Sequence, residues 1–251
     1  MHSDYLWGSV YGIDITNFGT ISGAKDPTLP GYSVWMNGVL GNIDNQGALI
    51  GDVYMLSGRM TNSGTVQGDV ELATWGRLKN SGVIYGDVLF TGTGIYHDTG
   101  SGVVTGSIFC GDSGNTIIGG KSADRIVGNL YIDTLSGNGG NDTLTGGGFN
   151  DRLTGGTGAD TFIYSSAIDS DATTGIDRIT DFEVGTDRID LSAFLSGATF
   201  IGGAGFSGTG AEVRYNAATG RLSGDVDGDG VADLVVVILN HAAITAGDLV
   251  L

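Results

Sequence analysis

Six aspartate or asparagine side chains recur every nine residues in the middle of the chain. They stand at the sixth position of consecutive units that begin at Cys110, and they are Asn115, Asp124, Asp133, Asp142, Asp151 and Asp160. An apolar residue follows two positions later in each unit, from Ile117 to Phe162. Carboxylate and carbonyl oxygens on flexible turns suit Ca²⁺, and they suit zinc or copper poorly. The spacing therefore predicts a series of calcium-binding turns.

The glycines of each unit predict how these side chains are positioned. The first six residues of a unit need positive φ and close backbone approach, and the last three suit a short strand with one apolar side chain turned inward. This nonapeptide pattern is typical of calcium-binding parallel β-helices. Two units then make one coil, and residues of successive coils stack about 4.8 Å apart. Asp124, Asp142 and Asp160 would share one side of the coil, and Asp133 and Asp151 the other.

Two of the turns keep glycine at the fourth position, where a bulky residue is costly if the backbone needs positive φ. Ser122, Tyr131 and Phe149 fill that position in other units. The glycines expected to shape the two best turns are Gly137, Gly139, Gly155, Gly156 and Gly158.

Stacked carboxylates should oppose folding unless a cation lies between them. Two of them about 5 Å apart repel by roughly 3 kcal/mol at an effective dielectric of about 20. We expect the tightest calcium site between Asp142 and Asp160, and a second between Asp124 and Asp142. The side that holds Asp133 and Asp151 should bind more weakly.

A second acidic cluster lies near the end of the chain. Asp225, Asp227, Asp229 and Asp233 occupy positions 1, 3, 5 and 9 of a loop with Gly230 at position 6, as in an EF-hand. The twelfth position is valine instead of glutamate, and both flanks look like strands. A calcium loop and an acidic hairpin turn therefore both remain open.

The part of the chain before Cys110 repeats more loosely. Asn45–Val53 is echoed by Asn62–Val70 and by Asn80–Val88, in steps of about one coil. The expected fold is all-β, a right-handed parallel β-helix that continues into a calcium β-roll and ends in a β-rich cap. The expected regions are an N-terminal strand or cap at 1–36, β-helix coils at 37–109, the roll at 110–163 and the C-terminal cap at 164–251.

From Gly119 onward the chain resembles the serralysin-type C-terminal domain of type I-secreted repeats-in-toxin (RTX) proteins. Besides the nonapeptides, the resemblance is carried by Ala159–Tyr164, Asp181–Phe194, Tyr215–Gly220 and Asp225–Asp233. It implies a Ca²⁺-loaded β-roll with a β-sandwich-like cap.

The resemblance also implies a route out of the cell. It predicts an extracellular protein of a Gram-negative bacterium, exported by a type I system that reads an uncleaved C-terminal signal. Gly247–Leu251, an acid followed by apolar residues, looks like such a signal. By the same resemblance, Asp181 and Asp190 are expected to bind a further ion.

Composition excludes several partners, and motif searches give no catalytic centre. The 251 residues carry a net charge of −17, which argues against nucleic acid and anionic membranes as partners, and no apolar run is long enough for membrane insertion. No H-E-x-x-H or G-x-S-x-G motif occurs. The one grouping with catalytic residue types in the looser coils is Tyr96–Asp98, and we expect no catalysis there.

The leading hypothesis is a secreted calcium-binding protein whose solenoid serves a structural or adhesive role at a cell surface or matrix. It would stay unfolded in the cytosol, where Ca²⁺ is scarce, and fold outside, where binding and folding become one event. Two alternatives remain. The first is a small protein that binds or modifies polysaccharide through its N-terminal coils. The second is the secretion and folding module of a larger exported enzyme.

Overall fold

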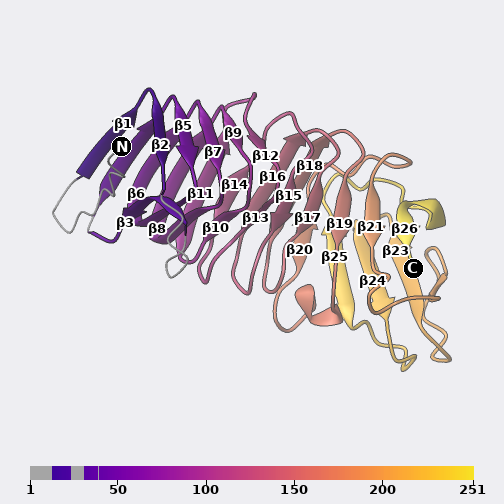
Figure 1. The fold of residues 1–251 in the computed structure, drawn as a ribbon. Coiled ribbons are helices and arrows are strands. Elements are labelled where there is room, and N and C mark those ends of the chain that lie inside the picture. Colours follow the sequence, from indigo (N-terminus) through magenta and orange to yellow (C-terminus); the bar gives the residue numbers. More distant parts are fainter. Residues whose placement is uncertain (1–12, 24–30, 39) are drawn as a thin grey trace. The chain divides into compact units, whose positions relative to one another are not determined.

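The computed structural model describes residues 13–23, 31–38 and 40–251, and nearly all of their regular structure is strand (Figure 1). The two helical segments are single 3₁₀ turns, η1 (Ala167–Asp169) and η2 (Ala246–Asp248). In the described part of the chain no helix could cross a membrane. The chain divides into two compact units, residues 1–125 and 126–251. Residues 1–12 and 24–30 of the expected N-terminal cap lie outside the described residues.

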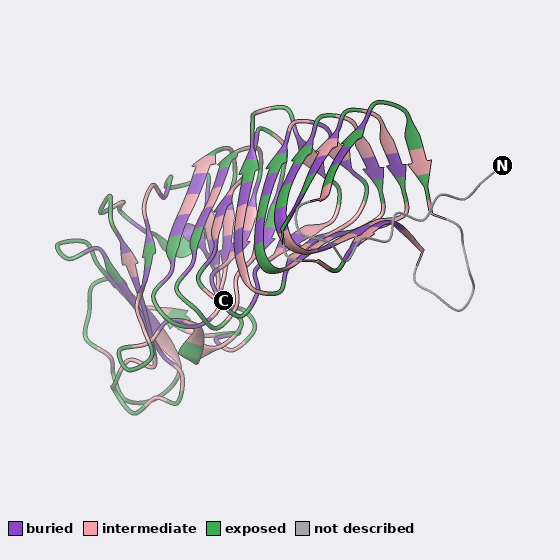
Figure 2. Ribbon diagram, turned by 90° about the vertical axis from the view of Figure 1, so that its left-hand side faces the viewer, coloured by how far each residue is buried: buried purple, intermediate pink, exposed green. Residues whose placement is uncertain are grey.

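The first unit is a stack of parallel coils. Five short strands form one sheet: β2 (Thr20–Ser22), β5 (Ala48–Ile50), β7 (Thr65–Gln67), β9 (Val83–Ile84) and β12 (Val103–Val104). The other strands of this unit are β1 (Ile13–Asn17), β3 (Tyr32–Met36), β4 (Gly41–Asn45), β6 (Asp52–Asn62), β8 (Val70–Asn80), β10 (Val88–Phe90), β11 (Thr93–Asp98), β13 (Ser107–Phe109) and β14 (Thr116–Ile118). Alternate side chains of these strands point inward, so buried and exposed residues alternate (Figure 2).

A ladder of buried asparagines lines one corner of the first unit. The amide of Asn17 donates to Asn45, that of Asn45 to Asn62, and that of Asn62 to Asn80, over 2.7–2.9 Å. Each of these side chains is 5% exposed or less. An amide both donates and accepts, so a stack of identical amides satisfies itself without any charge. The first unit therefore fills this corner with neutral groups.

The second unit is also coiled, and its first strands come from the nonapeptide repeat. These are β16 (Thr134–Gly139), β17 (Thr143–Thr145), β18 (Arg152–Thr157) and β19 (Thr161–Ile163), while β15 (Arg125–Val127) spans the division between the units in sequence. Leu135 pairs in register with Leu153, and Leu144 with Phe162, so one coil takes two nonapeptides. All four side chains are fully buried. The prediction of an all-β parallel solenoid is confirmed.

The coil does not end with the last nonapeptide. β20 (Asp177–Ile179) and β21 (Arg188–Asp190) pair in parallel with β18 and β19. After β22 (Thr199–Phe200), the strands β23 (Glu212–Asn216), β24 (Arg221–Asp225) and β25 (Leu234–Ile238) form an antiparallel meander. β25 then pairs in parallel with β20, and β26 (Leu249–Val250) with β21. This arrangement covers the edges of β20 and β21, which would otherwise be open to pairing with another chain.

Candidate metal centre

Two columns of buried aspartates run along the corners of the second unit. One column consists of Asp133, Asp151 and Asp177, and the other of Asp142, Asp160 and Asp187. All six side chains are at most 1% exposed. Carboxylates are rarely buried to this extent unless they are paired or bound to a metal.

In each column, the backbone N–H of one aspartate donates a hydrogen bond to the carboxylate of the next. The N–H of Asp133 donates to Oδ1 of Asp151 at 2.7 Å, and the N–H of Asp151 donates to Oδ1 of Asp177 at 2.8 Å. In the other column the N–H groups of Asp142 and Asp160 donate to the next carboxylate over 2.8 and 3.0 Å. An amide proton therefore lies beside the Oδ1 atom of each accepting carboxylate. The sequence predicts bare carboxylates that face one another, and this holds only for the Oδ2 atoms.

The second oxygens identify where a cation would fit. Oδ2 of Asp151, Asp160 and Asp177 is buried and accepts no hydrogen bond from the described residues. Such an oxygen costs about 1–3 kcal/mol, and more when it is charged. Hard oxygen donors without protons are what Ca²⁺ binds. The donor set of the two columns therefore fits the ion that the sequence predicts.

Glycine at the first position of each turn leaves the room for these oxygens. A methyl group built on Gly146 would lie 2.5 Å from Oδ2 of Asp151 and 3.0 Å from Oδ2 of Asp177. On Gly155 it would lie 2.3 Å from Oδ2 of Asp160. Real methyl carbons do not approach oxygen so closely, so any side chain here would displace a carboxylate. The glycine leaves open the space toward which two coils direct their carboxylates.

Burial disfavours the charged form of these groups. Burial, with the neighbouring Asp151 carboxylate, raises the pKa of Asp177 to about 8. Burial raises the pKa of Asp151 to about 7 and that of Asp124 to about 6. The pKa values of Asp160 and Asp187 are also raised, chiefly by burial. A bound cation would remove this penalty, because opposite charge favours the ionised form.

The backbone of the turns follows the expectation for the fourth position. Gly140 and Gly158 have φ of 111° and 130° there. Phe149 holds the same position with φ of 76°, a left-handed conformation that is strained for a bulky residue. Its ring stacks on Tyr131 of the neighbouring coil, with ring centroids 6.4 Å apart. This aromatic contact offsets part of the strain in the turn that precedes Asp151.

Two aspartates of the columns were not among the expected residues. Asp177 and Asp187 follow Asp151 and Asp160 after 26 and 27 residues, because inserted segments break the nine-residue period. A local signal exists, since Asp-Arg-Leu at 151–153 returns as Asp-Arg-Ile at 177–179 and at 187–189. Asp124 belongs to the first unit, where its Oδ2 accepts the N–H of Gly120 at 3.0 Å. The site expected between Asp124 and Asp142 therefore stays a prediction.

Asp181 and Asp190, which the resemblance adds, both accept backbone hydrogen bonds. The carboxylate of Asp181 accepts the N–H groups of Gly155 and Gly156 at 3.0 and 2.9 Å, so it caps the turn of the preceding coil. Oδ1 of Asp190 accepts the N–H and hydroxyl of Ser192. A further ion at these two residues stays a prediction.

The acidic cluster at 225–233 is the loop between the antiparallel strands β24 and β25. Carboxylate oxygens of Asp225, Asp227 and Asp229 lie within 4.8 Å of one another. Asp225 is buried and accepts the N–H groups of Gly228 and Gly230 at 2.7 and 2.9 Å, and Asp233 accepts the N–H of Val226 at 2.8 Å. The loop thus has the hydrogen bonds of a hairpin turn together with a spacing that would admit an ion, and both readings remain.

The residues Tyr96, His97 and Asp98 do not converge. Tyr96 and Asp98 are buried in the coil, whereas His97 is exposed on the outer face of β11. Neighbouring residues of a strand point to opposite faces, so the imidazole and the carboxylate are separated by the sheet. This grouping cannot act as one catalytic site.

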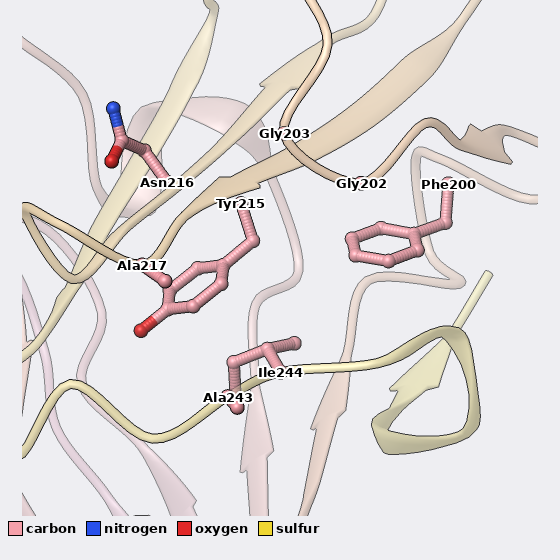
Figure 3. A pocket seen from close by; sticks show the side chains of 8 residues that line it. All are labelled: Phe200, Gly202, Gly203, Tyr215, Asn216, Ala217, Ala243 and Ile244. Carbon is pink, nitrogen blue, oxygen red and sulfur yellow. The ribbon is translucent and has the colours of Figure 1, made fainter.

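A cavity of about 370 Å³ in the second unit lies beside β23 (Figure 3). Phe200, Tyr215 and Ile244 contribute the large side chains of its lining, which contains no carboxylate. The hydroxyl of Tyr215 is buried without a hydrogen-bond partner among the described residues. The lining offers no anionic ligand, so this cavity is not a candidate for Ca²⁺.

Comparison with known proteins places this fold in a family. The sequence profile described as Peptidase M10 serralysin C terminal matches residues 31–251. The chain belongs to this family. Serralysin C-terminal domains are calcium-binding RTX β-rolls of secreted proteins. The match takes in all described strands from β3 onward, including both aspartate columns.

Individual relatives cover smaller parts. The metallopeptidase AprA of Pseudomonas marginalis is 38% identical over 89 residues, which are 34% of this chain and 18% of that protein. The chain thus spans less than a fifth of this serralysin-type relative. Two solved structures from the Azotobacter vinelandii mannuronan C5-epimerase are each 34% identical. The AlgE6R3 subunit has a TM-score of 0.44 and covers 55% of this chain and 78% of its own length, and AlgE6R2 has 0.42, 57% and 91%.

Proposed function

We propose that the two aspartate columns bind Ca²⁺ between successive coils, and that this binding completes the folding of the protein once it is outside the cell. The observation that carries the proposal is the set of buried, unpartnered Oδ2 atoms on Asp151, Asp160 and Asp177. In cytosol they remain without a counter-ion, which keeps this region unfolded for export by a type I system. Extracellular calcium sites have dissociation constants of up to roughly 10⁻³ M. Such sites fill outside the cell, and the free energy of binding then stabilises the fold.

The folded solenoid then presents its outer surface as a structural or adhesive element. A second candidate role is that of a secretion and folding module for a longer exported enzyme. The chain matches 18% of the length of a metallopeptidase, and this partial match favours the second role.

Calcium titration followed by circular dichroism and calorimetry tests the folding step. We expect a gain of strand signal with calcium and a lower melting temperature in excess chelator. The double variant Asp142→Ala and Asp160→Ala should lower the number of ions bound. Identical strand content and melting in chelator and in calcium would contradict the proposal.

A further inference from the structure

The first unit carries an exposed row of basic side chains on the outer face of three neighbouring strands. On β8, Trp75, Arg77 and Lys79 alternate with buried residues, so all three point outward. Arg59 of β6 pairs in register with Arg77, and His97 of β11 pairs with Lys79. The chain has 11 Lys and Arg residues and a net charge of −17, and three of the 11 lie in this row.

Nothing in the described part of the chain neutralises this row. The one ion pair among the described residues is Arg188 with Asp248, in the second unit. The carboxylates nearest in register, Asp14 and Asp44, accept hydrogen bonds from Asn42 and Gln46 instead. Like charges placed directly opposite on neighbouring strands destabilise a sheet. The protein therefore retains a local cost that a bound anion would remove.

The spacing and the side-chain types favour one kind of anion. Successive coils place Arg59 and Arg77 about 4.8 Å apart, which is close to the length of one sugar residue in an extended polysaccharide. Guanidinium groups bind carboxylates through two parallel hydrogen bonds. Trp75, 39% exposed on the same strand, offers a flat indole face of the kind that packs on a sugar ring. Ser57 and Thr93, which flank Trp75 in register, add hydroxyl groups.

We propose that this basic face, formed by Arg59, Arg77, Lys79, His97 and Trp75, binds an extended acidic polysaccharide through its uronate carboxylates. The role goes beyond calcium-dependent folding, because it uses the first unit and none of the aspartate columns. It gives the adhesive role a ligand of defined chemistry. Single-stranded nucleic acid is the competing polyanion, and its binding is an outcome of the test below.

The test uses the full chain in calcium, a short oligogalacturonate too small to gel, and isothermal titration calorimetry. We expect saturable binding that weakens with added salt, and at least a tenfold loss of affinity in the double variant Arg59→Ala and Arg77→Ala. Trp75→Ala should weaken binding while leaving its salt dependence unchanged. Circular dichroism and the calcium response of each variant should match the unaltered protein, which separates failure of this role from failure of calcium-dependent folding.

The chain offers a matched control. Arg152 and Arg178 also pair in register on neighbouring strands of the second unit and are exposed, but Arg178 donates to the carbonyl of Ile176 and no exposed tryptophan lies on either strand. The double variant Arg152→Ala and Arg178→Ala should bind the oligogalacturonate as the unaltered protein does. An equal loss in both double variants, tighter binding of single-stranded oligothymidylate, or no binding of the oligogalacturonate would each overturn the proposal.

Discussion

The backbone N–H of Asp151 donates to Oδ1 of Asp177 at 2.8 Å, although 26 residues separate the two in sequence. This bond places the carboxylate of one coil directly against the backbone of the previous coil. It fixes the orientation of the carboxyl group and leaves Oδ2 buried. The strand-to-strand register thus orients the second oxygen, so a change in register would disrupt the candidate metal centre.

Replacing Asp177 by asparagine should remove a calcium ligand while keeping the ladder intact. The asparagine carbonyl can still accept the N–H of Asp151, but the charge and the free oxygen are lost. We expect at least a tenfold loss of calcium affinity at one site and a smaller rise of melting temperature with calcium. Asp69→Asn is the matched control, because Asp69 also accepts an aspartate N–H in a ladder but is exposed. Similar losses in both variants would contradict the assignment.

Replacing a turn glycine with alanine should block the same candidate metal centre sterically. Gly155→Ala places a methyl group 2.3 Å from Oδ2 of Asp160, so the carboxylate must move. We expect this variant to fold only at raised calcium. A methyl group on Gly205 would contact no other atom, and this residue has no left-handed φ. The variant Gly205→Ala should therefore have the same calcium midpoint as the unaltered protein. The midpoint of the calcium titration, read by circular dichroism, distinguishes the two.

The calcium-free protein should lose stability as the pH rises. The folded-state pKa values of Asp151 and Asp177, about 7 and about 8, lie above the unfolded value of roughly 4. Protonation of these two carboxylates therefore stabilises the calcium-free fold. This contribution is complete below a pH of about 4 and is lost as the pH rises through the folded-state pKa values. With calcium the slope should reverse, because ion binding requires deprotonated carboxylates. Melting temperatures in chelator that rise with pH would contradict this prediction.

Chelation should unfold the second unit and spare the first. The asparagine ladder of the first unit is neutral and satisfies its own hydrogen bonds, whereas the columns of the second unit bury carboxylate oxygens whose charge a cation would balance. The second unit contains no tryptophan, so the fluorescence of Trp35 and Trp75 reports on the first unit. We expect tryptophan emission to stay unchanged in chelator while hydrogen exchange accelerates across residues 126–251. Simultaneous loss of both signals would show one cooperative unit instead.

The asparagine ladder itself should be sensitive to a single substitution. Asn62→Ala removes the acceptor of Asn45 and the donor to Asn80, which costs about 1–3 kcal/mol for each group left unsatisfied. Urea unfolding followed by tryptophan fluorescence measures this loss, and added calcium should not restore it. Thr61→Ala, on the exposed face of the same strand, should change stability by less than about 0.5 kcal/mol.

The sequence predicts most of the coil, because a strict nine-residue spacing leaves little choice of register. Leu135 over Leu153 and Leu144 over Phe162 follow directly from it. Asp177 and Asp187 escape this reasoning, since insertions before them hide the period, and only the recurring Asp-Arg pair marks them. Asn45, Asn62 and Asn80 were visible as a repeat, but only the structure shows that their amides bond to one another.

The strand β26 gives the end of the chain a second state. Leu249 and Val250 pair with Ile189 and Asp190, and Asp248 accepts the N–H of Gly185 and lies 4.0 Å from Arg188. Asp248, Leu249 and Val250 fall within the segment predicted as the secretion signal. Once they have become the last rung, their backbone is engaged and Leu249 is covered. We therefore expect an exporter to read the predicted signal only on a chain that has not yet folded, because the completed fold covers it.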